Sequence, residues 1–154
     1  MDDRHADTPV VVTGKLIRQE LEDDELESWL EGDARHGRGL RERQLIEWSD
    51  PRLPATKITV FNYIQCPHPA GVTAVFEGTH ILEDDDGSWL GTSTGIAFPD
   101  GSIEGQDFLL GRGAYQGLFA ILHARAETAP GDGGVTSWRG VILAGSPPPS
   151  PQPR

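Results

Sequence analysis

Eight extended runs, separated at regular intervals by short turn sequences, constrain the fold of this chain more than any other feature. The clearest run, residues 56–65, is rich in the β-branched and aromatic residues that favour strands. Asp86-Gly87 and Pro99-Asp100-Gly101 are strong turn signals between later runs. The pattern predicts an antiparallel meander whose strands lie within residues 9–18, 40–49, 56–65, 72–82, 88–98, 102–110, 117–127 and 135–144.

The number of runs favours a closed sheet. An open sheet of this size would leave two exposed edges that invite aggregation, and closing it into a barrel removes both of them. Eight strands is also a common size for a small barrel. We therefore expect a mostly β protein, a single eight-stranded antiparallel up-and-down barrel. A two-sheet β-sandwich built from the same strands is the alternative.

The segment 20–31 does not fit the meander. It is strongly acidic, and Leu26, Trp29 and Leu30 follow one another at helical spacing, with Gly32 placed as a helix stop. One interpretation is a short helix that covers a barrel mouth. The other is a pair of strand extensions around a long acidic loop, and the sequence leaves both open.

The length and the ends of the chain indicate one domain. A chain of 154 residues can bury a substantial core. Residues 1–8 are polar and charged, and residues 146–154 are rich in proline with no apolar side chain to bury. We expect a β-barrel domain over residues 9–145 between a disordered N-terminal tail and a disordered, extended Pro-rich tail.

Charge and cysteine content limit the partners. The net charge is −11, and such a surface repels phosphate backbones, so we expect no nucleic-acid partner. No apolar stretch approaches the length that spans a bilayer, and the first residues lack the apolar core of a secretory signal. Cys66 is the single cysteine, which excludes an intrachain disulfide. We expect a cytoplasmic protein.

A resemblance to a known group of barrels starts at Leu109-Leu110-Gly111-Arg112-Gly113-Ala114-Tyr115-Gln116-Gly117. This stretch is similar to the Gly-x-Gly-x-aromatic turn between late strands of allene oxide cyclase-like and dirigent-like barrels. The segments 100–105 and 138–143 fit the same arrangement, and Asp50-Pro51-Arg52-Leu53 looks like a feature of uncharacterised bacterial proteins with such barrels. The resemblance covers residues 56–144. It implies a small β-barrel, and some such barrels are cyclases that shape a polyene-like substrate in an apolar lumen.

Aromatic residues are the candidates for ligand binding. Tyr63, Trp89, Tyr115 and Trp138 all lie on or next to predicted strands. We expect Tyr115 to plug one end of the barrel. Packing in the wall is the favoured role for Trp89 and Trp138, because a glycine follows each of them two residues later and such glycines often lie beside rings in curved sheets.

The sequence assigns no catalytic residue. Glu77 and His123 are the candidates for acid–base work, although Glu77 facing solvent is the favoured interpretation of its strand. The histidines show none of the paired spacings of a metal site, and no phosphate-binding or nucleophile motif is present. We therefore expect no metal and no cofactor.

Three functions fit these features. The first is a binding protein that holds an apolar or amphipathic small molecule in the barrel, since small barrels are either filled by side chains or hold one ligand. The second is a cyclase or isomerase acting in the lumen, with Glu77, His123 and Tyr63 as candidate groups. The third is a structural or self-assembling module, which would form an oligomer.

Overall fold

A computed structural model describes residues 9–127, 135–147 and 149–154. It is all-β: the described residues form nine antiparallel strands and no helix. In chain order the strands are β1 (Val10–Glu22), β2 (Glu27–Glu31), β3 (Ala34–Trp48), β4 (Thr56–His68), β5 (Gly71–Glu83), β6 (Gly87–Ala97), β7 (Ile103–Gly113), β8 (Leu118–Glu127) and β9 (Val135–Ala144).

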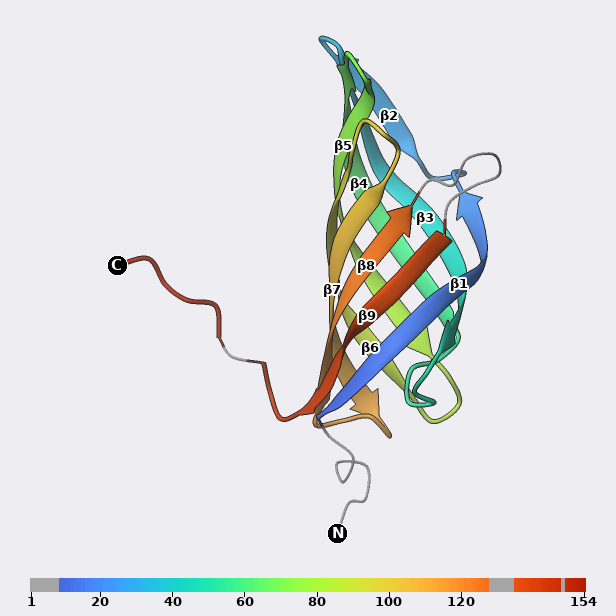
Figure 1. The fold of residues 1–154 in the computed structure, drawn as a ribbon, viewed down its shortest axis with the longest axis vertical. Coiled ribbons are helices and arrows are strands. Elements are labelled where there is room, and N and C mark those ends of the chain that lie inside the picture. Colours follow the sequence, from blue (N-terminus) through green and yellow to red (C-terminus); the bar gives the residue numbers. More distant parts are fainter. Residues whose placement is uncertain (1–8, 128–134, 148) are drawn as a thin grey trace.

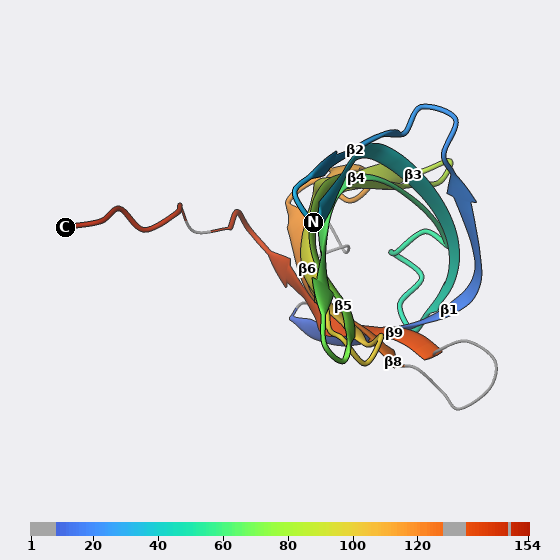
Figure 2. The same ribbon diagram turned by 90° about the horizontal axis from the view of Figure 1, so that it is seen from above.

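Eight of these strands close into a ring (Figure 2). Each strand from β3 to β8 pairs with the next one along the chain, and β1 pairs with both β9 and β3. Hydrogen bonding therefore passes around the ring without a break, which confirms the predicted eight-stranded antiparallel barrel. The sandwich alternative is wrong, because two separate sheets would interrupt this circuit. The ring is barrel-like, although it is not evenly round.

The predicted helix over residues 20–31 is wrong, and the alternative of strand extensions is correct. β1 continues to Glu22, and β2 pairs with the first part of β3 (Figure 1). A helix needs a face to bury, yet Leu21, Trp29 and Leu30 are exposed. The acidic segment instead lies beside the basic residues of β3, where Arg41 pairs with Glu22 at 3.0 Å.

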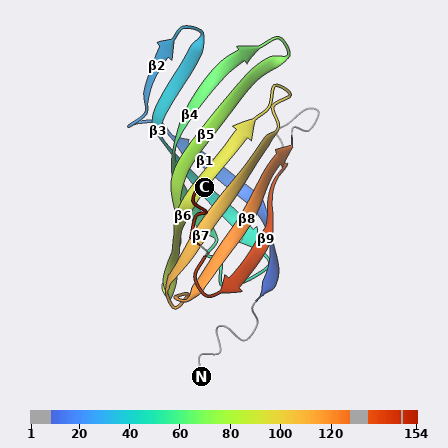
Figure 3. The same ribbon diagram turned by 90° about the vertical axis from the view of Figure 1, so that its left-hand side faces the viewer.

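The two hairpins β2–β3 and β4–β5 extend beyond the other strands at one end of the barrel (Figure 3). We call this the upper end, as it is drawn in Figure 1. At the opposite, lower end lie the start of β1, the end of β9 and the turns after β3, β5 and β7. No helix of the described chain is long and apolar enough to cross a bilayer.

The lower half of the barrel interior is filled by side chains. Its packed cluster consists of Val12, Ile46, Leu53, Leu82, Trp89, Leu109, Tyr115, Leu118, Ala120, Leu122, Trp138 and Ile142. The residues between β3 and β4 turn into the ring and close this end (Figure 2). There Trp89 Nε1 donates to the carbonyl of Arg52 at 2.7 Å, and Trp48 Nε1 donates to the carbonyl of Pro54 at 3.0 Å.

The described residues at the C-terminus lie outside the barrel. The described residues after Ala144 form no strand and extend away from it (Figure 1). The predicted N-terminal tail, residues 1–8, lies outside the described residues.

Candidate functional site

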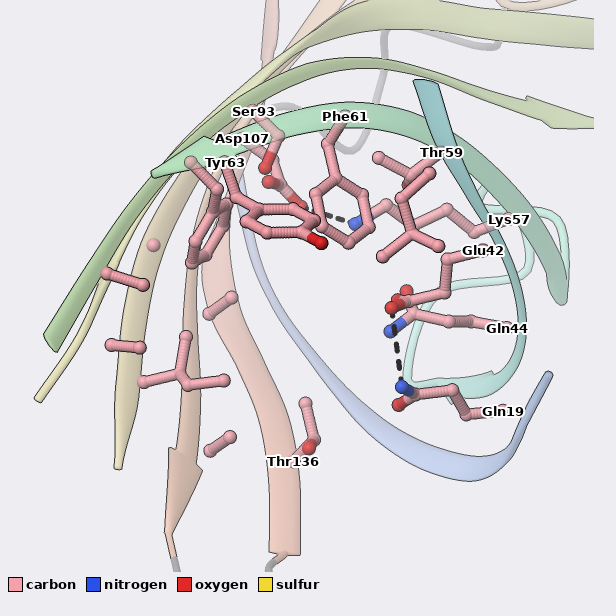
Figure 4. Close-up of a pocket in the computed structure, with 18 of the residues that line it drawn as sticks. Gln19, Glu42, Gln44, Lys57, Thr59, Phe61, Tyr63, Ser93, Asp107 and Thr136 are labelled. Carbon is pink, nitrogen blue, oxygen red and sulfur yellow. Dashed lines mark hydrogen bonds and ion pairs between the residues drawn. The ribbon is translucent and has the colours of Figure 1, made fainter. Parts of the chain in front are cut away.

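The upper half of the barrel interior contains a cavity of about 320 Å³ (Figure 4). Residues from all eight ring strands line it. They are Gln19, Leu40, Glu42, Gln44, Lys57, Thr59, Phe61, Tyr63, Gln65, Ala74, Phe76, Ser93, Ala97, Ile103, Gly105, Asp107, Ala124, Ala126, Thr136 and Trp138. The polar and the apolar members form separate groups.

Strand alternation brings these residues to the interior. Successive side chains of a strand point to opposite faces, so Lys57, Thr59, Phe61 and Tyr63 of β4 all face the lumen. The intervening Val60 faces outward and is 40% exposed. One strand therefore contributes two polar groups near the lower half and two aromatic rings toward the mouth.

Five buried polar side chains form the base of the cavity, and we call them the polar floor: Gln44, Lys57, Thr59, Ser93 and Asp107. Lys57 Nζ donates to Asp107 Oδ2 at 2.8 Å, across the lumen from β4 to β7. The Lys57 ammonium also lies over the Trp138 ring, 5.2 Å from its centroid, in a cation–π contact. A buried lysine in this position therefore has both an ionic and an aromatic partner.

The electrostatics of the floor favour an ionised Asp107. Burial raises the pKa of Asp107, but the charges of Lys57 and His80 and the hydrogen bonds from Lys57 and Ser93 outweigh it, so this pKa is lowered overall. His80 is also buried, with Nδ1 3.9 Å from the Asp107 carboxylate. Burial first, and the charge of Lys57 second, lower the pKa of His80 to about 4. His80 is therefore neutral at pH 7.

Two groups beside the floor make no hydrogen bond of normal geometry with the described residues. They are the His80 imidazole, whose pKa the Phe108 backbone nevertheless acts to raise, and Trp138 Nε1. Buried polar atoms are usually satisfied by protein or by ordered water. Trp138 lines the cavity, so water or a ligand atom near its indole would satisfy this donor.

Glu42 lies higher in the cavity, on β3 (Figure 4). Gln19 Nε2 from β1 donates to Glu42 Oε2 at 3.3 Å, and no ion pair forms between Glu42 and a described cationic side chain. Burial raises the pKa of Glu42 above its usual value, the charge of Lys57 opposes this, and the charge of Asp107 adds to it. Glu42 is thus a partly desolvated carboxyl group facing the lumen.

Three aromatic rings form one wall of the cavity: Phe61, Tyr63 and Phe76. Phe61 packs against both neighbours, with ring centroids 6.5 Å from Tyr63 and 6.0 Å from Phe76. Two of the rings lie over cross-strand glycines: a Cβ built on Gly37 would come within 2.2 Å of Tyr63, and one on Gly95 within 2.1 Å of Phe76. These glycines fix where the rings lie.

The residues proposed from the sequence lie in three different places in the structure. Tyr63 of β4 and Trp138 of β9 line the cavity. Trp89 and Tyr115 lie in the filled lower half, where their rings stack with centroids 5.5 Å apart and Tyr115 donates to Asp84. Glu77 and His123 are exposed on the outer surface, on strand positions that alternate away from the lumen, so neither contacts the cavity.

Lys57, Asp107 and Glu42 are not among the residues proposed from the sequence. Lys57 had a usable signal, because alternation along the clearest strand of the chain puts its side chain on the same face as Phe61 and Tyr63. Glu42 lies between Arg41 and Arg43, and Asp107 lies between Gln106 and Phe108, so nothing local distinguishes either carboxylate. Their meeting with Lys57 depends on the register between strands that are far apart in the sequence.

The described residues contain no group of three or more histidine, cysteine, aspartate or glutamate side chains placed to hold a metal ion. The side chains of the cavity offer an ion pair, a carboxyl group, hydroxyl and amide groups, and ring faces. No protein-family model matches the sequence, and no curated protein matches it.

Proposed function

We propose that this barrel binds a small amphipathic molecule in its upper cavity. The molecule lies against the rings of Phe61, Tyr63 and Phe76, and its polar end lies toward Glu42 and the polar floor. The observation that supports this best is the contrast between the two halves of one barrel. The lower half is packed by large side chains, whereas the upper half has a cavity of about 320 Å³ at the lower end of the size range of ligand pockets.

Small residues explain how the space arises. Ala74, Ala97, Ala124 and Ala126 occupy inward positions where leucine or phenylalanine would fill the lumen. The same strands present Leu82, Trp89 and Leu122 at inward positions lower down. The interior is therefore divided along individual strands, with large residues at one end and small ones at the other.

A polarity-sensitive dye that is uncharged at neutral pH, N-phenyl-1-naphthylamine, tests this proposal. We expect its fluorescence to rise on binding to the wild-type protein. Ala124→Phe, which fills the cavity, should abolish the rise. The matched control His123→Phe adds the same ring on the outer face of the same strand and should leave dye binding unchanged.

Two results would contradict the proposal. One is the absence of any dye binding by folded wild-type protein at accessible concentrations. The other is equal dye binding by the wild type and Ala124→Phe, which would place the dye on the outer surface, where several large apolar side chains are exposed.

The cyclase or isomerase alternative rests on Glu42, since a buried carboxyl group with a raised pKa is suited to proton transfer. An enzyme of this kind would catalyse hydrogen exchange or rearrangement of a bound polyene or enone. Incubation of such a compound in D₂O, followed by mass spectrometry, tests it. Deuterium incorporation with the wild type and not with Glu42→Gln would support catalysis.

The self-assembly alternative depends on the outer surface of the barrel and not on the cavity. Val60, Val75, Ile96 and Phe108 are large apolar side chains exposed on the outer faces of β4 to β7. Light scattering would distinguish a monomer, which removes this alternative, from a stable oligomer, which supports it.

A further inference from the structure

The charges that line the cavity do not balance. Among its described lining residues, Lys57 is the one cation, whereas Glu42 and Asp107 are both acidic. Lys57 and Asp107 neutralise each other through their 2.8 Å contact. This leaves Glu42, whose described hydrogen-bond partner is the neutral amide of Gln19. When Glu42 is ionised, the lining has one uncompensated negative charge.

A cationic ligand group would offset the cost of that charge. Removing a carboxylate from water is unfavourable unless an opposite charge or hydrogen bonds replace the lost solvation. Gln19 supplies one hydrogen bond at 3.3 Å, which is long for this kind of contact. An ammonium group beside Glu42 would supply both charge and donors.

The aromatic wall faces the same space. Figure 4 shows the rings of Phe61 and Tyr63 and the carboxyl group of Glu42 directed into the same space, from the adjacent strands β4 and β3. Aromatic ring faces attract cations, more strongly where water is excluded. A carboxylate beside ring faces is an arrangement suited to a protonated amine.

An anionic ligand fits the cavity less well. Its natural partner, Lys57, already donates to Asp107, and a second anion would lie close to Asp107 as well as to Glu42. The protein as a whole has a net charge of −11, which raises the local concentration of cations and lowers that of anions.

We propose that the cavity selects an amphipathic amine, whose protonated nitrogen binds between Glu42 and the rings of Phe61 and Tyr63. The ligand class is an alkyl or arylalkyl amine small enough for the cavity. This inference rests on the proposed binding function and specifies its ligand chemistry.

A matched series of eight-carbon ligands tests it: octylamine, octanol and octanoate share one chain and differ in the charge of the head group. Each competes with N-phenyl-1-naphthylamine at pH 7.5. We expect octylamine to displace the dye at about tenfold lower concentration than octanol, which is the size of effect expected from one partly buried cation contact. Octanoate should be the weakest competitor.

Glu42→Gln keeps the shape of the side chain and removes its charge. In this variant octylamine and octanol should compete equally. A β-rich circular dichroism spectrum and a cooperative urea unfolding transition would show that the variant is folded, so a lost amine preference cannot be attributed to a collapsed barrel.

A pH titration of the wild type gives a second readout that needs no variant. The other titratable groups facing the cavity are Lys57, Tyr63 and Asp107 among the described residues, and His80 lies beneath it. Because burial raises the pKa of Glu42, the advantage of octylamine over octanol should fall as this group is protonated on acidification. The affinity for octanol itself should not change over the same pH range.

The competition results distinguish failure of the amine proposal from failure of the proposed binding function. If octanol and the dye bind but octylamine has no advantage, the amine proposal is wrong and the binding function stands. Preference for octanoate would also overturn it and identify Lys57 as the anchor. If neither the dye nor octanol binds, the binding function itself fails.

Discussion

The ammonium nitrogen of Lys57 lies 2.8 Å from a carboxylate oxygen of Asp107, although the two residues are 50 positions apart in the chain. They come from β4 and β7, which are separated in the ring by β5 and β6. The pair therefore spans the lumen and divides the filled half of the barrel from the open half. Both side chains are almost fully buried, at 6% and 2% exposure.

The first prediction concerns this pair. Lys57→Met leaves Asp107 as a buried charge without its cation, and we expect a loss of about 3–5 kcal/mol in the free energy of unfolding. Asp107→Leu should cost a similar amount, because it leaves the buried ammonium group of Lys57 without its carboxylate partner. The double variant should be more stable than either single variant, since it leaves no unpaired charge. Urea denaturation of the four proteins measures the coupling, and purely additive losses would contradict it.

The second prediction concerns His80. Its pKa is lowered from 6.5 to about 4 in the folded protein, so on acidification the unfolded chain binds a proton before the folded one does. Stability should therefore fall as the pH falls from about 6.5 to about 4, by roughly 3 kcal/mol in total. The charged groups packed around His80 are Lys57 of β4 and Asp107 of β7.

His80→Gln should flatten the stability curve in that pH window when unfolding is measured in urea at a series of pH values. Below about pH 4 a further loss should remain in the variant, because the pKa of Asp107 is lowered on folding and its contribution disappears as this carboxylate is protonated. An unchanged slope between pH 6.5 and 4 in the variant would show that His80 is not the group responsible.

The third prediction concerns Gly37, which lies against the ring of Tyr63. A Cβ at this position would come within 2.2 Å of the ring, so Gly37→Ala must displace Tyr63 or the strand. We expect a loss of about 1–3 kcal/mol in stability and a weaker affinity for octanol. Gly37→Ala/Tyr63→Leu removes the clash and should recover most of the stability. If Gly37→Ala alone changes neither quantity, the ring does not depend on this glycine.

The fourth prediction separates the closed end from the cavity. Leu53, in the segment between β3 and β4, is 3% exposed and packs in the lower core. Leu53→Ala should destabilise the protein by about 2–5 kcal/mol. Octanol and dye affinities of the folded variant should stay within about twofold of wild type, because the cavity lies in the other half of the barrel. A large loss of affinity would show that the two halves are coupled.

Local sequence patterns were sufficient for the strands and for the way they connect. The run 56–65 begins at the first residue of β4, and the Asp86-Gly87 and Pro99-Asp100-Gly101 signals lie where β5 turns into β6 and β6 into β7. The segment 20–31 was ambiguous because Leu26, Trp29 and Leu30 have helical spacing. Pairing of its backbone with β3 decided the outcome, and spacing within one segment does not reveal such a partner.

The sequence by itself determined the alternation of short strands and turns, and hence the antiparallel meander, because these depend on residues close together in the chain. Only the tertiary structure decided which half of the ring is filled and which charges meet. Lys57, Asp107 and Glu42 come together through the register of β3, β4 and β7 around a closed sheet, and a shift of one residue in any pairing would turn a whole strand's side chains to the other face.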